Sequence, residues 1–380
     1  MRAPGFFSVL LVAALIAALP AAATGQAAGG GPAANLWFAA PSFDARGGFE
    51  QLFVTDADPG SALTASIAGT SEVDDLGSVM FRELSPGHYI VATSGTVNWG
   101  VEVGSAEGST PEHSFYDDQE INEGFTYVET RDGTTLSAYV VLPGPVEDGP
   151  YPTVVDYSGY NPSDPFSGLG GGFDATPLCG SLPTLCKAPA QPGSQLAGLF
   201  GYATVGVNVR GTGCSGGAYD FFETMQVLDG FDVIEAVAAQ PWVKDHEVGM
   251  VGLSYPGISQ LFVAQSNPPS LGAITPLSVY GDTAILAPGG LLNTGFATSW
   301  ADQVLRNAES CGTGWVRRAI DEGDAQCDAN QQLRGQNVDA TAKARSQPFC
   351  TDEVAAPLDT REFAGDIEAA VFLTSAFQDE

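Results

Sequence analysis

The sequence predicts an α/β protein preceded by a small all-β domain, and two observations favour this. From residue 121 onward, short apolar runs alternate with helical patterns, which is typical of a mostly parallel sheet covered by helices. Residues 35–110 are instead rich in Thr, Ser, Val and Gly, with short alternating runs around a Pro-Gly turn, as in a β-sandwich. The acidic stretch 111–120 is expected to be a linker, and the chain has room for about two domains.

The N-terminus has the three parts of a secretory signal. Arg2 supplies the positive charge, residues 6–19 are apolar, and three alanines at 21–23 form a small-residue cleavage site. A membrane anchor is the competing interpretation, but the apolar run is short for a bilayer span. We therefore expect 1–23 to be removed on export, leaving 24–34 as a small-residue linker.

The charge balance excludes two classes of partner. Forty-five acidic residues against fourteen basic ones give a formal net charge of −31, which repels nucleic acid and anionic lipid. Three scattered histidines and the lack of a C-x-x-C pair disfavour zinc, so we expect no metal ion and no cofactor. Six cysteines in an exported chain favour disulfides. From spacing we expect the pairs Cys179–Cys186 and Cys311–Cys327, which leaves Cys214 for Cys350.

The elements of the second part follow in order. Strands at 125–130 and 136–142 flank an Arg-Asp-Gly turn, which predicts a hairpin. A helix is expected at 229–239, with Asp229 as its N-cap, Asp232 in its first turn and Pro241 just beyond its end. Residues 283–365 interrupt the alternation and are expected to form a lid across the strand ends. Further strands are predicted at 153–156, 203–209, 248–253, 273–277 and 370–374.

A candidate nucleophile lies in the run Gly-Leu-Ser-Tyr-Pro-Gly at 252–257. The uncharged strand 248–253 precedes it, and Ile258, Leu261 and Phe262 follow at helical spacing. A serine on such a sharp strand-to-helix turn holds its hydroxyl clear of the sheet. The first amides of the helix then point to where a carbonyl oxygen would become negative. The pattern predicts a nucleophile at Ser254, with a tight structural turn as the alternative.

Several long motifs in a fixed order resemble one hydrolase group. They are the glycine-rich run 201–217, Asp-Gly-Phe-Asp-Val-Ile-Glu at 229–235, Gln-Pro-Trp at 240–242 and the turn around Ser254. Over about 121–380 the chain resembles the X-prolyl dipeptidyl-peptidase and cocaine-esterase-like α/β-hydrolases. The resemblance implies an α/β-hydrolase fold with a lid insertion. It also implies a serine hydrolase that cleaves an X-Pro peptide bond, or an ester or amide bond, through an acyl-enzyme.

The resemblance also implies site residues. Ser254 corresponds to the nucleophile, and the backbone amide of Tyr255 to half of the oxyanion hole. The hydroxyl of Tyr160 corresponds to the other half, with Tyr157 as its rival. Asp379 corresponds to the acid of the triad, although an Ala-Phe pair replaces the Gly-Trp pair that the family has before it.

The histidine of the triad is missing from this sequence. His246 precedes the strand 248–253 and is therefore expected at the opposite end of the sheet from Ser254, while His88 and His113 lie outside the hydrolase part. The simplest interpretation is that the chain stops before the histidine loop and the C-terminal domain of the family, with a natural pseudoenzyme as the alternative. We expect the 380-residue chain alone to be inactive and to expose apolar surface around 371–373.

Specificity is expected to lie in the lid. Phe296, Trp300 and Trp315 could line an acyl pocket or could simply pack the lid core. Asp220 and Glu223 are candidates to hold the free amine of a peptide substrate, although solvated loop acids are the simpler interpretation. The alternative function from another class is a secreted binding protein that uses the 35–110 domain and has an inert hydrolase part.

Overall fold

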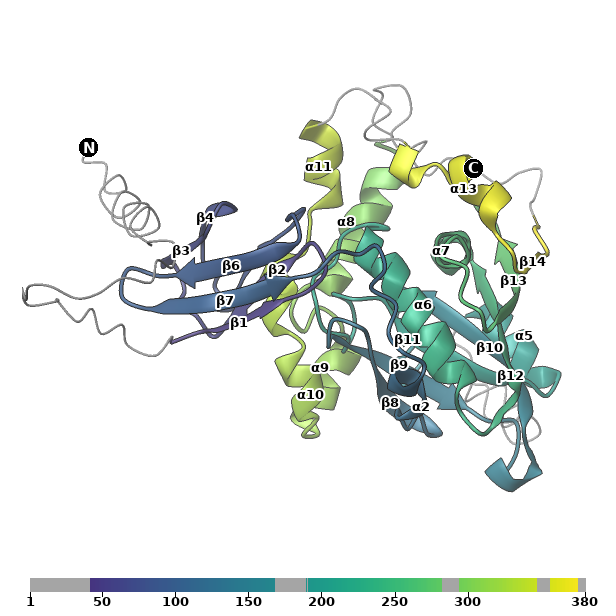
Figure 1. Cartoon of the computed structure of the whole chain (residues 1–380). Coiled ribbons are helices and arrows are strands. Elements are labelled where there is room, and N and C mark those ends of the chain that lie inside the picture. The colour runs from purple at the N-terminus through teal and green to yellow at the C-terminus, as the bar shows by residue number, and fades with distance from the viewer. Residues whose placement is uncertain (1–41, 168–188, 190, 282–293, 347–355, 375–380) are drawn as a thin grey trace, which may run out of the picture.

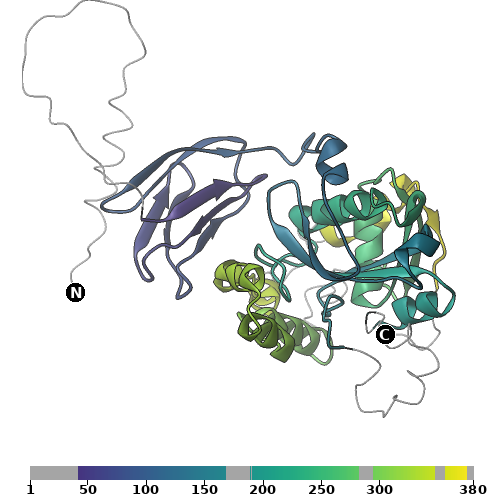
Figure 2. The same ribbon diagram turned by 90° about the horizontal axis from the view of Figure 1, so that it is seen from below.

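A computed structural model describes residues 42–167, 189, 191–281, 294–346 and 356–374 (Figures 1 and 2). An antiparallel β region at the N-terminus is followed by a seven-stranded sheet with helices on its faces. The helices within residues 294–346, called the lid below, lie between the two, as both views show. The predicted signal at 1–23, the linker at 24–34, Asp379, Cys179, Cys186 and Cys350 lie outside the described residues.

The N-terminal region is a two-sheet sandwich whose strands lie within the predicted range 35–110. Neighbouring strands in both sheets are antiparallel. Leu52, Val54, Leu63 and Val91 are fully buried between the sheets and form part of one apolar core. One sheet has the order β1 (Asp44–Gly47), β2 (Leu52–Thr55), β5 (Val79–Phe81); the other has the order β4 (Gly69–Glu72), β3 (Ala62–Ala65), β6 (Gly87–Ala92), β7 (Val97–Val103).

The seven-stranded sheet that follows the sandwich confirms the predicted α/β class. Its order is β14-β13-β12-β10-β11-β9-β8. The predicted hairpin is present as the antiparallel pair β8–β9, β9 is antiparallel to β11, and the remaining pairs are parallel. The strands are β8 (Gly124–Glu129), β9 (Thr135–Val141), β10 (Tyr151–Ser158), β11 (Ala203–Asn208), β12 (Val243–Leu253), β13 (Leu271–Leu277) and β14 (Ala370–Val371).

Helices cover both faces of this sheet. Tyr157 on β10 reaches helix α6, whereas its neighbour Asp156 contacts Ser194 on α5, and successive strand residues point to opposite faces. The α-helices are α2 (Ser114–Asp117), α5 (Pro192–Leu199), α6 (Thr224–Ala238), α7 (Tyr255–Ala264), α8 (Ala297–Ala308), α9 (Gly314–Asp321), α10 (Ala325–Ala329), α11 (Ala340–Ser346) and α13 (Thr360–Phe363). Short 3₁₀ helices are η1 (Val146–Asp148), η4 (Gln332–Gln336), η5 (Ala356–Leu358) and η6 (Ala364–Asp366).

Helix α6 corrects the prediction for Asp229. The helix begins at Thr224, so Asp229 is an interior residue rather than the N-cap, and Asp232 is not in the first turn. Both aspartates are fully buried. Asp229 pairs with Arg210, and Asp232 pairs with Arg131. The N-cap prediction was wrong because an aspartate in a buried ion pair also lies beside apolar helical residues. The two arginine partners lie outside the helix, so the helix sequence alone does not reveal the pairs.

The cysteine pairing also differs from the expectation. Cys214 is joined to Cys327, 113 residues later, which contradicts both Cys311–Cys327 and Cys214–Cys350. Cys311 is free of any disulfide among the described cysteines. The loop around Cys214 packs against the lid, where Asn330 Nδ2 donates to the Cys214 carbonyl at 2.7 Å and Arg334 donates to the carbonyls of Gly213 and Ser215. The pairing therefore follows from contacts in the folded protein, which the spacing of the cysteines along the sequence does not reveal.

The lid is bonded to the sandwich as well. Ser78 Oγ donates to the carbonyl of Gln332 at 2.8 Å, and Gln336 Oε1 accepts from the amide of Met80 at 3.0 Å. Apolar side chains from the sandwich, the lid and the segment after Arg210 meet in a small buried cluster. The members of this cluster, called the junction cluster below, are Phe53, Met80, Ala218 and Leu333. The sandwich is thus joined to the rest of the protein by specific contacts.

Strand β14 is one of the two edge strands of the seven-stranded sheet. The side chains of Val371, Phe372 and Leu373 are 51%, 68% and 59% exposed, which confirms the expected apolar surface at 371–373. Elsewhere, none of the helices in the described ranges is both long enough and apolar enough to cross a membrane.

Candidate active site

Ser254 lies at a strained turn between β12 and α7. Its φ is 67° and its ψ is −123°, a conformation that costs a non-glycine residue about 1–3 kcal/mol. Its amide donates to the carbonyl of Leu277 on the next strand at 2.9 Å, which helps to hold the turn. A Cβ atom at position 252 would lie 2.5 Å from Pro256 Cβ, and one at position 257 would lie 2.5 Å from the Leu277 oxygen. Only glycine fits at both positions, so the glycines permit the sharp turn that presents the serine.

Tyr160 is brought beside Ser254, and its rival Tyr157 is not. The Tyr160 hydroxyl lies 3.4 Å from Ser254 Oγ. Trp300 Nε1 on α8 donates to the same hydroxyl at 2.5 Å. Because an indole N–H can only donate, the tyrosine oxygen accepts from Trp300 and keeps its own proton for another acceptor. Tyr157 is buried and donates to the carbonyl of Gln226 on α6.

Tyr255 places a backbone amide next to the candidate nucleophile. As the first residue of α7, it has no helical carbonyl one turn earlier for its N–H to bind. Its side chain is fully buried, accepts from Gln226 Nε2 at 3.1 Å and donates to Tyr219 at 3.4 Å. Burial raises the pKa of the Tyr255 phenol, so this group stays protonated and acts in packing. The backbone, rather than the side chain, is available for the chemistry.

Four aromatic rings pack around the Tyr255 ring and are called the aromatic wall below; they belong to Tyr160, Phe221, Phe222 and Trp300. The ring centroid of Phe222 lies 5.2 Å from that of Tyr255, and the centroid of Trp300 lies 5.8 Å from it. Phe221 joins Trp300 at 5.5 Å, and Tyr160 meets the edge of Tyr255 at 5.6 Å. The two adjacent phenylalanines were not expected here. Their only sequence signal is an aromatic pair that follows the glycine-rich run by a few residues.

The three lid aromatics have different places. Trp300 contacts the candidate site directly, as described above. Trp315 is buried with the disulfide of Cys214 and Cys327, and its Nε1 donates to Asn161 at 3.2 Å. Phe296 is the N-cap residue just before α8 and is 39% exposed.

Asp220 and Glu223 are not solvated loop acids. Asp220 is 9% exposed and forms an ion pair of 2.9 Å with Lys343. Glu223 accepts a hydrogen bond of 2.9 Å from Gln51 of the sandwich, with Arg82 Nε at 3.9 Å. Both carboxylates therefore have protein partners, and the expectation of free, hydrated acids is wrong.

Each of the three histidines lies away from Ser254. His246 is on β12, where its Nδ1 bonds the carbonyl of Ala238 at 2.9 Å, and Ser254 follows the other end of this strand. At about 3.3 Å per residue, the eight residue steps between His246 and Ser254 separate the two by roughly 26 Å. His88 lies on β6 of the sandwich, and His113, which precedes α2, pairs with Asp117 of that helix.

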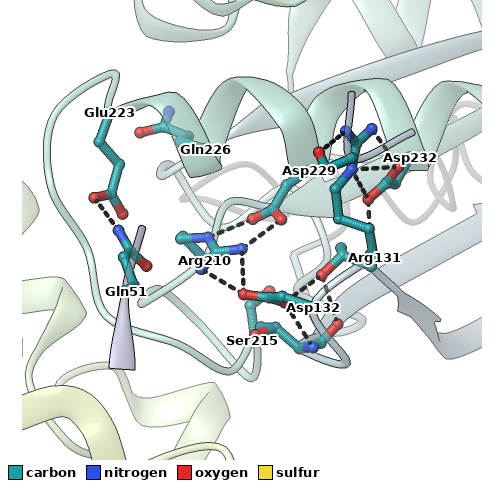
Figure 3. A network of polar contacts seen from close by, with 12 residues as sticks. Gln51, Arg131, Asp132, Arg210, Ser215, Glu223, Gln226, Asp229 and Asp232 are labelled. Carbon is teal, nitrogen blue, oxygen red and sulfur yellow. Dashed lines mark hydrogen bonds and ion pairs between the residues drawn. The ribbon is translucent and has the colours of Figure 1, made fainter. Parts of the chain in front are cut away.

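A buried ionic network is centred on Arg210 (Figure 3). The guanidinium of Arg210 is completely buried, with two contacts of 2.6 Å to Asp229 and two of 3.2 and 3.3 Å to Asp132. Burial alone would raise the pKa of Asp132, but Arg210, Arg46 and Thr134 together lower it to about 2. Burial raises the pKa of Asp229 to about 6 against the pull of Arg210, which leaves it mostly ionised at neutral pH. The network ties the hairpin turn, the glycine-rich loop and α6 together.

The chain is similar to several known hydrolases. The family model of the X-Pro dipeptidyl-peptidases (S15 family) matches residues 132–380. A protein of Mycobacterium bovis, named as a candidate serine esterase, is 28% identical over 198 residues, which are 50% of this chain and 30% of that protein. A protein of the same name from Mycobacterium tuberculosis matches equally. The chain thus spans less than a third of the length of these curated relatives.

Solved structures were matched as well. A CocE/NonD family hydrolase from Staphylococcus aureus is 23% identical, with 65% of this chain and 39% of that chain covered and a TM-score of 0.45. An aminopeptidase from a marine sediment archaeon of the Thaumarchaeota is 18% identical, with 70% and 44% covered and a TM-score of 0.46. Because the family model matches well over half of its residues, the chain belongs to the X-Pro dipeptidyl-peptidase (S15) family.

Proposed function

We propose that this protein is a serine hydrolase that cleaves a peptide, ester or amide bond through an acyl-enzyme on Ser254. The observation that supports it best is the turn itself. Ser254 is held in a strained conformation after β12, with its Oγ 3.4 Å from the hydroxyl of Tyr160 and next to the first amide of α7. This geometry supports a site in which a nucleophile and two oxyanion donors act on one substrate carbonyl.

The mechanism assigns one role to each group. Ser254 Oγ attacks the substrate carbonyl and passes its proton to a base, and the carbonyl oxygen becomes negative. The Tyr255 amide and the Tyr160 hydroxyl donate to this oxyanion, each contributing about 2.7–4 kcal/mol by analogy with other oxyanion holes. The intermediate then expels the leaving group, which takes the proton from the base, and water releases the acyl group by the reverse route.

None of the three histidines of the chain is a candidate for the base. The chain has three histidines, and each is placed away from Ser254. We propose Asp379 as the carboxylate that orients the base and a histidine outside residues 1–380 as the base itself. The 380-residue chain alone should then retain only the catalysis due to binding and the oxyanion hole, about 10³–10⁴-fold over water.

For the substrate, the family name supports an X-Pro peptide and the mycobacterial relatives support an ester. The carboxylates of Asp220 and Glu223 are engaged by Lys343, and by Gln51 and Arg82, so they do not favour a free amine in this part of the site. Contacts of the sandwich with the lid also make an independent binding module the weaker alternative.

A matched pair of serine variants tests the proposal in the full gene product. Ser254→Ala should abolish hydrolysis of p-nitrophenyl acetate and Ala-Pro-p-nitroanilide, as well as labelling by a fluorophosphonate. Ser259→Ala, on the same helix but bonded to the carbonyl of Tyr255, should keep both activities. Retention of a substantial rate by Ser254→Ala, with an unchanged circular dichroism spectrum, would refute the role of this serine.

We also propose that the protein is exported with residues 1–23 removed, which the composition of that segment supports. N-terminal sequencing of the protein from the culture medium should begin at Thr24. Finding the intact N-terminus in the cell fraction alone would contradict export.

A further inference from the structure

The segment 219–223 reaches both the candidate site and the sandwich. At one end, Phe221 and Phe222 belong to the aromatic wall around Tyr255. Phe222 has a φ of +52°, a left-handed conformation that is unusual for a bulky residue and persists only where the surroundings hold it. Its ring stacks on Phe262 of α7 at 4.3 Å, and its amide donates to Gln226 at 3.1 Å. Contacts from outside the segment therefore hold Phe222, and with it the aromatic wall, in place.

At the other end, Glu223 joins this segment to the sandwich (Figure 3). The Glu223 side chain is 12% exposed, and its Oε2 accepts from Gln51 Nε2 at 2.9 Å. Three buried atoms at this contact have no hydrogen-bond partner among the described residues: Glu223 Oε1, Gln51 Oε1 and Arg82 Nε. Buried polar atoms are rarely left unsatisfied. The contact therefore has room for one more hydrogen, which a protonated carboxyl group would supply.

The charges that face Glu223 come from four elements. Arg82 follows β5 of the sandwich, Arg210 follows β11, Asp220 lies on the same segment and Asp229 lies on α6. Arg210 is already committed to Asp132 and Asp229, and the nearest Arg82 contact is 3.9 Å. Burial is the largest effect and raises the pKa of Glu223 to about 7, although both arginines lower it. The neutral form is thus favoured in the docked contact.

We propose that Glu223 is a positioning residue, which joins the sandwich to the aromatic wall and holds Phe221 and Phe222 against Tyr255 more firmly when its carboxyl group is protonated. When protonated, Glu223 gains a donor, and the unpartnered Gln51 oxygen is a buried acceptor in the same contact. When ionised, Glu223 accepts a hydrogen bond from Gln51 Nε2, while the guanidinium of Arg82 lies 3.9 Å away. The effect on catalysis rests on the function proposed above, whereas the effect on the contact does not.

The size of the response follows from linkage. A carboxyl group with a pKa of about 7 when docked and 4.5 when hydrated binds its proton more tightly in the docked state. Opening of the contact is therefore favoured as pH rises, by about tenfold between pH 6 and pH 8. The change is largest below the docked pKa and levels off above it.

Hydrogen exchange measures this without requiring activity. In the wild type, exchange of peptide amides from 219–227, corrected for intrinsic rates, should rise about tenfold between pH 6 and pH 8. Glu223→Gln, which cannot ionise, should show no such rise. Glu235→Gln is the matched control, because Glu235 is a buried glutamate of α6 that binds Ser270 instead of the sandwich, and it should behave as the wild type. Identical pH profiles for the wild type and Glu223→Gln would overturn the proposal.

A second variant covers the case in which Glu223→Gln does not fold. Gln51→Leu removes the sandwich partner, so exchange of 219–227 should already be high at pH 6 and independent of pH. A wild-type profile in this variant would also overturn the proposal. Fluorophosphonate labelling of the full gene product over the same pH range separates the two proposals. If no labelling occurs at any pH, the hydrolase function fails while the exchange result still decides the role of Glu223.

Discussion

The indole of Trp300 donates a hydrogen bond to the hydroxyl of Tyr160, and that hydroxyl in turn lies 3.4 Å from Ser254 Oγ. The lid helix α8 thereby fixes the direction in which Tyr160 can donate. Trp300 from the lid and Ser254, which follows β12, both contact the hydroxyl oxygen of Tyr160, so the lid is linked to the proposed oxyanion donor.

This relationship predicts graded effects of two substitutions on the full gene product. Tyr160→Phe removes the donor and should lower kcat by about 10²–10³-fold with little change in KM. Trp300→Phe keeps a ring in place but removes the orienting N–H, so kcat should fall by about tenfold, the value of one modest hydrogen bond. Tyr157→Phe serves as the control, because Tyr157 bonds to Gln226 and should affect stability rather than kcat. An unchanged kcat in Tyr160→Phe would remove this tyrosine from the oxyanion hole.

The buried network predicts a large loss of stability on removal of its central cation. Arg210→Met would leave the carboxylates of Asp132 and Asp229 buried without their shared partner, at a cost of roughly 3–5 kcal/mol in the free energy of unfolding. Arg318→Met is the comparison, since Arg318 and its partner Glu322 are both more than half exposed, and its cost should be about 1 kcal/mol or less. Urea unfolding measures both, and similar costs for the two variants would contradict the importance of burial.

A third prediction concerns pH and Asp156, which is fully buried on β10. Ser194 donates to its Oδ2 at 3.5 Å, while its Oδ1 has no partner among the described residues. Burial raises the pKa of Asp156 to about 8. A raised carboxyl pKa means that the folded protein holds one more proton than the unfolded chain between about pH 4 and pH 8, so its stability falls as pH rises across this window.

Asp156→Asn removes that ionisation while keeping the shape of the side chain. The variant should be more stable than the wild type by roughly 5–6 kcal/mol at pH 8 and above, with the difference vanishing toward pH 4. Asp118→Asn, at an exposed aspartate, should leave the curve unchanged. Thermal or urea unfolding at several pH values provides the measurement, and parallel curves for wild type and Asp156→Asn would show that Asp156 does not titrate in this range.

The disulfide gives a fourth prediction. Peptide mapping without reductant should recover Cys214 linked to Cys327 and no Cys311–Cys327 peptide. Because the bridge closes a loop of 113 residues, its reduction should destabilise the protein by about 4–5 kcal/mol in the chain-entropy description. The change in the urea midpoint on adding dithiothreitol measures this, and a midpoint that does not move would mean that the loop is already held by other contacts.

Local patterns predicted the parts of the structure that local contacts determine. The turn around Ser254 depends on two glycines and on an apolar strand followed by an apolar helix, and all of these are adjacent in sequence. The hairpin β8–β9 and the parallel strands were predicted for the same reason. These features need no knowledge of distant residues.

Contacts between distant residues were missed or misassigned. Asp229 has the pattern of an N-cap, but its partner is Arg210, which belongs to another segment. Cys327 pairs with Cys214 rather than with its sequence neighbour. The resemblance preferred Tyr160 to Tyr157, but the bond from Trp300 to Tyr160 was not predicted. Nothing in the sequence around Glu223 indicates that Gln51 of the sandwich bonds to it. Asp379, the candidate acid, lies outside the described residues, so its role stays a prediction.

The junction cluster has a consequence for how the protein comes apart. Phe53 and Met80 come from the sandwich, Leu333 from the lid and Ala218 from the segment after Arg210, and all four are buried against one another. Loss of any one of these three parts would uncover apolar surface on the other two. The sandwich is therefore a cooperative part of the folded unit, and heating should melt all three parts in one transition instead of releasing a folded hydrolase region from a detached N-terminal domain.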